Sequence, residues 1–296
     1  RSLIYEFIYT YRFKWSIEMM CRVLKVSRSS YYYWLKDPVS KRMKQAKSME
    51  DKIKAIYFQA KGRYGSPRIR EELCKRGDLV SLPTIAKYMK RMGLKSRYSR
   101  KYKPTTDSSH KEPIAENILD RDFFSFSPSE KCVSDITYLP TKDGFLYLTI
   151  VVDLFNRDII GWTLSSNMKA QNTVIAAINK AAVNSPFQDG MIFHSDRGVQ
   201  YAAKATVNTL KSYNLTQSMS RKANCWDNAV AEAFFKSLKM ELIYGNKLMN
   251  KNQMRAAIFE YIEIWYRKQR RHSYLDYMTI EEFNEQYKKQ NSKNVA

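Results

Sequence analysis

Three acidic residues, Asp135, Asp196 and Glu232, are candidates for chemistry. Asp135 interrupts "CVSDITYL", which alternates like a strand, although aspartate packs poorly on a pleated surface and is costly to bury without a partner. Asp196 follows a short apolar run in "FHSDRGVQY", and Glu232 lies in "DNAVAEAFFKSLK", which has the spacing of an amphipathic helix. A turn or cap role is the common alternative for Asp196.

These carboxylates predict a metal site. Three carboxylates brought together repel one another unless a divalent cation is present. An oxygen-only set is what Mg²⁺ prefers, and we expect Mn²⁺ to substitute for it. Two such ions held about 3.5 to 4 Å apart activate a water or a 3′-hydroxyl on one side of a phosphodiester and stabilise the departing oxygen on the other. Asp135, Asp196 and Glu232 are therefore the candidate catalytic residues and metal ligands.

Other titratable residues near these motifs are given structural roles. Asp153, Asp158 and Asp227 are expected to be turn or cap residues, and Asp227 would cap the helix that carries Glu232. His194 is expected to pack or to hydrogen-bond, because Mg²⁺ disfavours imidazole ligands.

The charge of the chain is strongly positive and unevenly distributed. The 296 residues include 51 Lys and Arg against 29 Asp and Glu, a formal net charge of +22. Residues 1–100 hold 25 basic and 8 acidic side chains, whereas residues 101–296 hold 26 and 21. A basic module attached to a nearly neutral one indicates nucleic acid as the leading partner, and a merely solvated surface is the alternative.

The composition disfavours several other classes of protein. The four cysteines are scattered without a close pair and only three histidines are present, so neither a disulfide framework nor a zinc finger is supported. No stretch approaches the roughly 18 uninterrupted apolar residues of a membrane span, and residues 1–3 do not resemble a signal peptide. We expect a globular, cytoplasmic protein without a membrane partner.

Two helix-turn-helix patterns are predicted in the basic third of the chain. In "WSIEMMCRVLKVSRSSYYYWLK", Ser16 and Ser27 precede two short helices joined by a tight turn. In residues 66–94, a second helix has Pro83 in its first turn and ends at Gly93. The side chains expected to contact DNA here and in the adjoining "KSRYSRKYK" are Arg28, Ser29, Ser30, Lys87, Lys90, Arg91, Arg97 and Arg100.

Four more basic residues are candidates for DNA contact. Lys236 and Lys239 share one helix face with Glu232, at i+4 and i+7, where Lys239 could steady a phosphate. A basic run near the C-terminus contains Arg270 and Arg271, which fit a DNA backbone contact and a solvated helix end about equally well.

The pattern changes to strands beyond a Pro-, Ser- and Thr-rich linker. Runs at 131–141, 145–152 and 158–165 predict an antiparallel meander. It is followed by a helix over 171–184, a strand at "MIFHS", a helix around 203–212, a strand near "TQSMS" and a helix from about 227 to 242. The predicted fold class is α/β, a mixed sheet flanked by helices and preceded by an all-α helix-turn-helix region.

Several separated motifs resemble a known family. "SDITYL", "HSDRGVQY" and "ANCWDNAVAEAFFKSLK" resemble the three signatures of the D,D(35)E transposase and retroviral integrase superfamily, and 35 residues separate Asp196 from Glu232. "CRVLKVSRSSYYYW", "RYGSPRIREEL", "MKRMGLKSR", "NILDRDF" and "WYRKQRRHSYLDYMTIEEF" are similar to the second-frame product of bacterial insertion-sequence family three, which makes its transposase by frameshifting between two overlapping frames. The resemblance covers nearly the whole chain, although Cys132 stands where the family usually has a tryptophan.

The resemblance implies an RNase H-like core and Mg²⁺-dependent strand cleavage at the element's ends, followed by attack of the freed 3′-hydroxyl on target DNA. By position it assigns the ligand roles to Asp135, Asp196 and Glu232. It implies as partners the terminal inverted repeats, target DNA, further copies of this chain and the first-frame product of the same element. The alternatives are a non-catalytic DNA-binding regulator and a metal-dependent nuclease without strand transfer.

The expected domain organisation has five segments. They are a first helix-turn-helix at 1–40, a second helix-turn-helix-like region at 41–104, a linker at 105–125, an RNase H-like integrase catalytic core at 126–245 and a C-terminal helical extension at 246–296.

Overall fold

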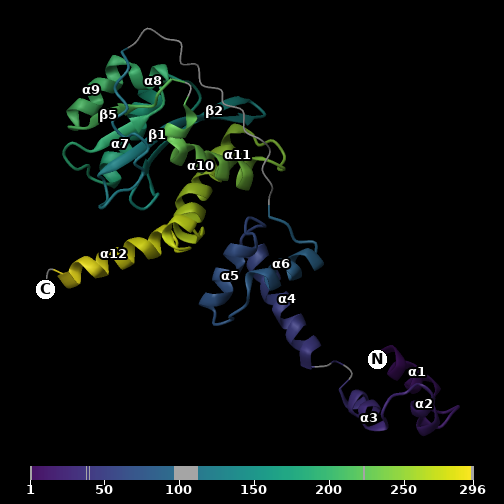
Figure 1. Cartoon of the computed structure of the whole chain (residues 1–296). Coiled ribbons are helices and arrows are strands. Elements are labelled where there is room, and N and C mark those ends of the chain that lie inside the picture. The colour runs from purple at the N-terminus through teal and green to yellow at the C-terminus, as the bar shows by residue number, and fades with distance from the viewer. Residues whose placement is uncertain (1, 38, 40, 97–112, 223, 295–296) are drawn as a thin grey trace. The chain divides into compact units, whose positions relative to one another are not determined.

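The computed structural model describes residues 2–37, 39, 41–96, 113–222 and 224–294 (Figure 1). The chain divides into two compact units, Arg1–Ser96 and Arg97–Ala296. None of the described helices combines the length and apolar character that a membrane crossing requires.

The N-terminal unit is built from helices in its described residues. They are α1 (Ser2–Tyr11), α2 (Ile17–Val23), α3 (Arg28–Lys36), α4 (Lys41–Gln59), α5 (Ser66–Lys75) and α6 (Leu82–Arg91). The predicted caps are confirmed, since Ser16 accepts a hydrogen bond from the N–H of Met19 at 3.2 Å and Ser27 from that of Ser30 at 3.1 Å. Each cap satisfies one of the orphan donors at a helix start.

The apolar faces of these helices form two packed groups. Helices α1, α2 and α3 contact one another around Ile8, Cys21 and Tyr31, which are buried. Helices α4, α5 and α6 contact one another as well, and both α5 and α6 begin with a proline in the first turn. Gly93 follows α6 with a φ of +68°, a left-handed conformation that ends a helix cheaply only at glycine.

The C-terminal unit contains a five-stranded mixed sheet, as the sequence predicted. Its strands are β1 (Lys131–Thr141), β2 (Gly144–Asp153), β3 (Ile159–Ser165), β4 (Ile192–Ser195) and β5 (Thr216–Met219). The strand order is β3-β2-β1-β4-β5, in which β3, β2 and β1 are antiparallel while β1, β4 and β5 are parallel. The long central strand β1 therefore joins the meander to the parallel half.

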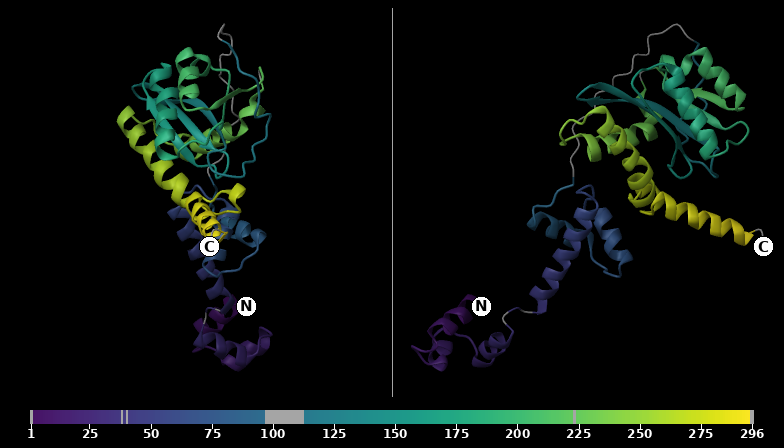
Figure 2. Two further views of the ribbon diagram at one scale, coloured as in Figure 1. Left: turned by 90° about the vertical axis from the view of Figure 1, so that its left-hand side faces the viewer. Right: turned by 180° about the vertical axis from the view of Figure 1, so that it is seen from behind.

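The helices of this unit cover both faces of the sheet. They are η1 (Ala170–Asn172), α7 (Val174–Asn184), α8 (Val199–Ala202), α9 (Lys204–Ser212), η2 (Cys225–Asn228), α10 (Ala229–Leu238), η3 (Lys239–Ile243), α11 (Lys251–Phe259), η4 (Glu260–Gln269), η5 (Ser273–Leu275) and α12 (Ile280–Asn294). The helix expected over 227–242 is thus three consecutive pieces, a 3₁₀ turn, α10 and a π-helical turn. Figure 2 shows α12 extending outward from the sheet.

The register decides which residues face which helices. Gly161 on β3 pairs with Val151 on β2, and α7 approaches so closely there that a Cβ on Gly161 would lie 2.4 Å from the carbonyl oxygen of Ala177. Neighbouring residues of a strand point to opposite faces. Trp162 accordingly faces the other way, where its indole Nε1 donates to Glu263 of η4 at 2.7 Å. The C-terminal helices therefore cover the face opposite α7.

Part of the expected linker packs on the sheet unit. Residues 105–112 lie outside the described residues, whereas the backbone of residues 116–119 bonds to β5. The N–H of Met219 donates to the carbonyl oxygen of Glu116 at 3.1 Å, and Ser218 Oγ accepts from the N–H groups of Ile118 and Leu119. These bonds cover the outer edge of β5.

Arg270 and Arg271, two of the predicted DNA contacts, form ion pairs within the C-terminal part of the chain. Both side chains are buried, and Arg270 pairs with Glu241 at 3.1 Å while Arg271 pairs with Glu282 at 2.5 Å. A guanidinium taken out of water needs a carboxylate partner, and both groups have one here. Trp265 also donates to Glu241, so the basic run is part of the C-terminal core.

Candidate catalytic site

Asp135 and Asp196 are brought together by the parallel pairing of β1 with β4. The register runs from Lys131 opposite Ile192 to Ser134 opposite Ser195. Asp135 and Asp196 are the next residues on the two strands. Neighbouring parallel strands lie about 4.8 Å apart, so the two carboxylates start from adjacent backbone positions at one end of β4.

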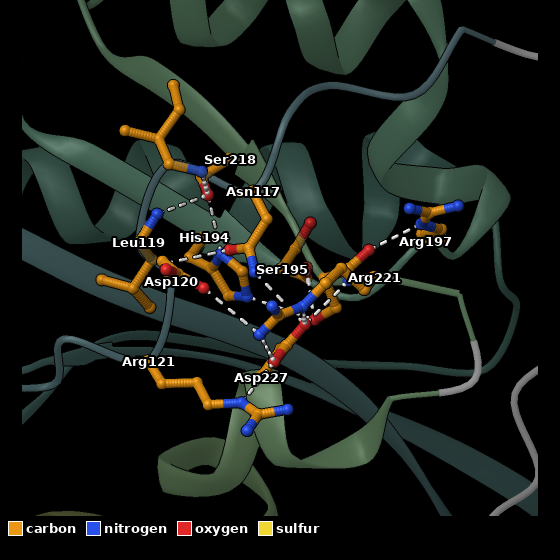
Figure 3. Close-up of polar contacts among 12 residues, drawn as sticks. Asn117, Leu119, Asp120, Arg121, His194, Ser195, Arg197, Ser218, Arg221 and Asp227 are labelled. Carbon is orange, nitrogen blue, oxygen red and sulfur yellow. Dashed lines mark hydrogen bonds and ion pairs between the residues drawn. The ribbon is translucent and has the colours of Figure 1, made fainter.

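Asp196 occupies a turn that holds its carboxylate in place. Its Oδ1 accepts a hydrogen bond from the N–H of Gly198 at 2.9 Å. A Cβ on Gly198 would stand 3.0 Å from that oxygen, so a larger residue there would require the carboxylate to shift by a few tenths of an ångström. The side chain of the next residue, Arg197, donates from Nε to the carbonyl oxygen of Ser220 at 2.6 Å (Figure 3). The turn and the metal-ligand interpretations of Asp196 are thus compatible.

Glu232 comes from α10, which packs on β1. The residue before the helix, Asn228, is buried, and its Nδ2 donates to the carbonyl oxygen of Ser134 at 3.1 Å. Ser134 immediately precedes Asp135. Asn228 therefore joins the start of the helix that carries Glu232 to the strand that carries Asp135.

Electrostatics show that these side chains share one environment. Burial raises the pKa of Asp135 well above its usual value, and the charges of Asp196 and Glu232 raise it further. Burial also raises the pKa of Glu232, with Asp196 adding to the effect. Burial lowers the pKa of Lys239, although the charge of Asp135 opposes that shift. Three like charges and one lysine therefore converge here.

The donor set fits a hard divalent cation by its chemistry, because it consists of carboxylate oxygens. Within the part of the chain that the structure describes, no group of three or more His, Cys, Asp or Glu side chains is close enough to hold a metal ion as it stands.

His194 and Asp227 have structural roles. The ring nitrogens of His194 lie 2.8 Å from Ser218 Oγ and 3.1 Å from Ser220 Oγ, and burial lowers its pKa to about 4 (Figure 3). The expected hydrogen-bonding role of His194 is confirmed. The expected capping role of Asp227 is wrong, because the N-cap residue of α10 is Asn228 and Asp227 instead forms ion pairs with arginines.

The remaining predicted DNA contacts are distributed over both units. Arg28, Ser29 and Ser30 are exposed on the first turn of α3, and Ser30 also bonds to the capping Ser27. The exposed basic residues of α6 are Lys87, Lys90 and Arg91, of which Arg91 pairs with Glu50 of α4. Lys236 is exposed on α10. Arg97 and Arg100 lie outside the described residues.

Sequence reasoning missed Arg121, Arg221 and Asn228, all of which have defined contacts around this site. Asn228 could have been suspected, because it lies one helical turn before Glu232. Arg121 lies in the motif "NILDRDF", but nothing local indicated its partner Asp227, which is 106 residues away along the chain.

Three family models match the chain. Two described as integrase core domain match residues 127–225 and 232–289, and one described as HTH-like domain matches residues 44–102. These matches agree with an integrase-like, RNase H-like core preceded by a helical helix-turn-helix region.

Relatives match over most of their length. The chain is 39% identical over 281 residues to the transposase InsF for insertion sequence IS3A of Escherichia coli strain K12, covering 94% of this chain and 97% of that protein. It is 35% identical over 268 residues to the insertion element IS600 uncharacterized 31 kDa protein of Shigella sonnei, covering 90% and 98%.

Solved structures of integrases also match. The HTLV-2 integrase catalytic core domain in complex with magnesium is 15% identical, with a TM-score of 0.36 over 49% of this chain and 93% of that one. The catalytic core domain of BIV integrase is 16% identical, with a TM-score of 0.39 over 55% and 99%.

Proposed function

This chain belongs to the IS3 family of insertion-sequence transposases with an integrase core, and on that premise we propose that it cleaves phosphodiester bonds at insertion-sequence ends and transfers the freed 3′-hydroxyl to target DNA. The observation that carries the proposal is the adjacency of Asp135 and Asp196 on neighbouring parallel strands, with Glu232 on the helix packed against them. Carboxylates forced together in this way favour a bound divalent cation over mutual repulsion.

Asp135, Asp196 and Glu232 would hold two Mg²⁺ ions, with Mn²⁺ as a substitute. Bound there, the ions would activate a water or a 3′-hydroxyl and stabilise the departing oxygen. The raised pKa values of Asp135 and Glu232 support this assignment, because a cation would relieve the like-charge repulsion that contributes to them. Lys239 is drawn into the same environment and would hold a phosphate of the substrate.

The N-terminal unit would bind DNA. Its helix-turn-helix regions, at 1–40 and 41–104, present the exposed basic residues of α3 and α6. The catalytic core would span residues 126–245 and the helical extension 246–296. The terminal inverted repeats and the target would be the DNA substrates, and the active assembly would contain several copies of this chain with the first-frame product of the element as a further partner.

The test is an incubation of the chain with Mg²⁺ and a labelled duplex carrying a terminal inverted repeat. Nicked and joined products together support the proposal. Nicking without joining leaves a metal-dependent nuclease, and binding without nicking leaves a non-catalytic regulator. Binding should weaken steeply as salt rises, because phosphate contacts release counterions.

A further inference from the structure

Asp227 lies fully buried between two arginines, immediately before the helix that carries Glu232 (Figure 3). Its Oδ1 accepts from Arg121 Nε and Arg221 NH2, both at 2.8 Å, and its Oδ2 accepts from Arg221 Nε at 2.9 Å. The backbone N–H of Arg221 and the side chain of Asn117 also donate to Oδ2. We call Arg121, Asp227 and Arg221 the arginine clamp.

In the clamp, one carboxylate, that of Asp227, holds the guanidinium groups of two arginines. Its hydrogen bonds, chiefly those from Arg221, hold the pKa of Asp227 well below its usual range, so the carboxylate stays charged. The clamp therefore carries a net charge of +1. Both guanidinium groups are nevertheless partly open to solvent, since the side chains of Arg121 and Arg221 are 46% and 47% exposed.

Part of each guanidinium is not used by the carboxylate. Arg121 donates only from Nε, and no other described residue accepts from its two terminal nitrogens. Arg221 also contacts Asp120 at 3.3 Å, but Asp120 is 72% exposed, and ion pairs of this exposed kind are weak. An incoming anion could displace that contact. The clamp thus presents outward N–H donors that are already oriented.

One end of the clamp is joined to the strand of Asp135. Asp227 is followed by Asn228, whose Nδ2 donates to the carbonyl oxygen of Ser134, the residue before Asp135. Since that carbonyl oxygen can only accept, the orientation of the Asn228 amide is fixed. The clamp is therefore held beside the carboxylates through two consecutive buried residues.

The other end is joined to the turn of Asp196. Arg221 follows Ser220, whose carbonyl oxygen accepts from Nε of Arg197 at 2.6 Å, and whose N–H donates to the carbonyl oxygen of Ser195 at 2.9 Å. Ser195 and Arg197 flank Asp196. Both ends of the segment that connects β5 to α10 are thus tied to the strands that supply the two aspartates.

We propose that the arginine clamp binds a backbone phosphate of the DNA strand that enters the carboxylate site. The inference rests on the proposed function, which brings DNA to this edge of the sheet. Guanidinium groups match the geometry of phosphate oxygens and form charge-assisted hydrogen bonds with them. Asp227 holds both side chains in one conformation before DNA arrives, so less side-chain entropy is lost on binding.

The test compares the DNA affinity of the wild-type chain with that of the Arg121→Gln variant at several salt concentrations. The substitution removes the positive charge but keeps an N–H donor for Asp227. The probe is a fluorescein-labelled terminal-repeat duplex without divalent metal. The variant should bind this duplex and an unrelated duplex more weakly by a similar factor, and the slope of log K against log salt should become shallower by about one. Arg121→Lys should keep the wild-type slope, because it keeps the charge.

Lys211→Ala is the matched control, because Lys211 is an exposed lysine at the end of α9 and its loss removes the same charge. An unchanged slope for Arg121→Gln, or an equal change for Lys211→Ala, overturns the inference. If circular dichroism shows that Arg121→Gln does not fold, Arg221→Lys serves instead. This variant should bind DNA more weakly with an unchanged salt slope. An unweakened affinity would count against the clamp. Wild-type cleavage is scored separately with Mg²⁺, so a failure of the proposed function is distinguishable from a failure of the clamp.

Discussion

Asp135 on β1 and Asp196 directly after β4 each lie one residue beyond the last paired residues of these two parallel strands, Ser134 and Ser195. Strand pairing fixes the two backbones up to the residue before each carboxylate, so the two backbone positions are adjacent. Rotation of the side chains is one way to lower the repulsion between the two charges. A bound cation or a retained proton also lowers the repulsion between the two carboxylates. The raised pKa of Asp135 means that, without a cation, this carboxyl group retains its proton to higher pH.

Asp196→Asn should abolish cleavage and leave DNA affinity unchanged. The amide keeps the size of the side chain and the hydrogen bond from Gly198 but removes a charged ligand. We expect a loss of more than about 100-fold in the cleavage rate, because changes to residues that only orient metal ligands already cost about 10- to 100-fold. Cleavage of a labelled terminal repeat and a binding titration measure the two quantities.

Asp189→Asn is the control for that experiment, since Asp189 is an exposed aspartate in the same unit. It should cut at the wild-type rate. If Asp196→Asn cuts as fast as this control, the assignment of the site is wrong.

Mg²⁺ should stabilise the wild-type chain and not the Asp196→Asn variant. A ligand that binds only the folded state adds free energy of unfolding that grows with its concentration, by about 2.7 kcal/mol at 100 times its dissociation constant. Thermal unfolding with Mg²⁺ and with a chelator gives the comparison. An equal rise in melting temperature for both proteins would place the ion elsewhere.

Loss of the proton from Asp153 should make the C-terminal unit less stable as the pH rises from about 4 to 7. It accepts hydrogen bonds from the N–H groups of Ser129 and Phe155, both at 2.9 Å, and burial raises its pKa to about 6. The unfolded value is about 3.9, so between these values the folded state binds the proton more tightly and stability is lost as the proton leaves.

The neutral variant Asp153→Asn lacks this titration. Its free energy of unfolding relative to wild type should therefore increase with pH over that interval, by at most about 3 kcal/mol. Denaturant unfolding at several pH values measures the difference. A difference that is constant, or that decreases with pH, would contradict the predicted direction of the pH dependence.

Glu241→Gln should destabilise the C-terminal unit by about 3 to 5 kcal/mol, because it leaves the buried guanidinium of Arg270 without a counter-charge. Glu241 also accepts from Tyr261 at 3.0 Å and Trp265 at 2.8 Å, so the loss affects three contacts. The double variant Glu241→Met with Arg270→Met should lose less than the single variant, since no charge remains buried. Unfolding midpoints measure both, and a double variant that is less stable than the single one would refute the argument.

The sequence by itself determined the elements and their chemistry. The alternation of 131–141 and the continuous apolar run of 145–152 predicted strands that the structure confirms, since a half-buried strand has a period of two and a fully buried one reads as an apolar run. Ser16 and Ser27 marked helix starts, because their side chains satisfy local backbone donors. Asp135 was recognisable because it interrupts the alternation of its strand, and Asp196 because it ends an apolar run. All of these signals are local.

Only the tertiary structure decided which distant charges meet. Arg121 and Asp227 become partners because the backbone of residues 116–119 bonds to β5, and nothing near either residue in the sequence encodes that contact. Arg270 lies in a run whose composition is typical of an exposed basic segment. It nevertheless pairs with Glu241, which lies on the π-helical turn after α10. A charge in a sequence has no fixed partner until the chain folds, because burial sets the cost of leaving it unpaired.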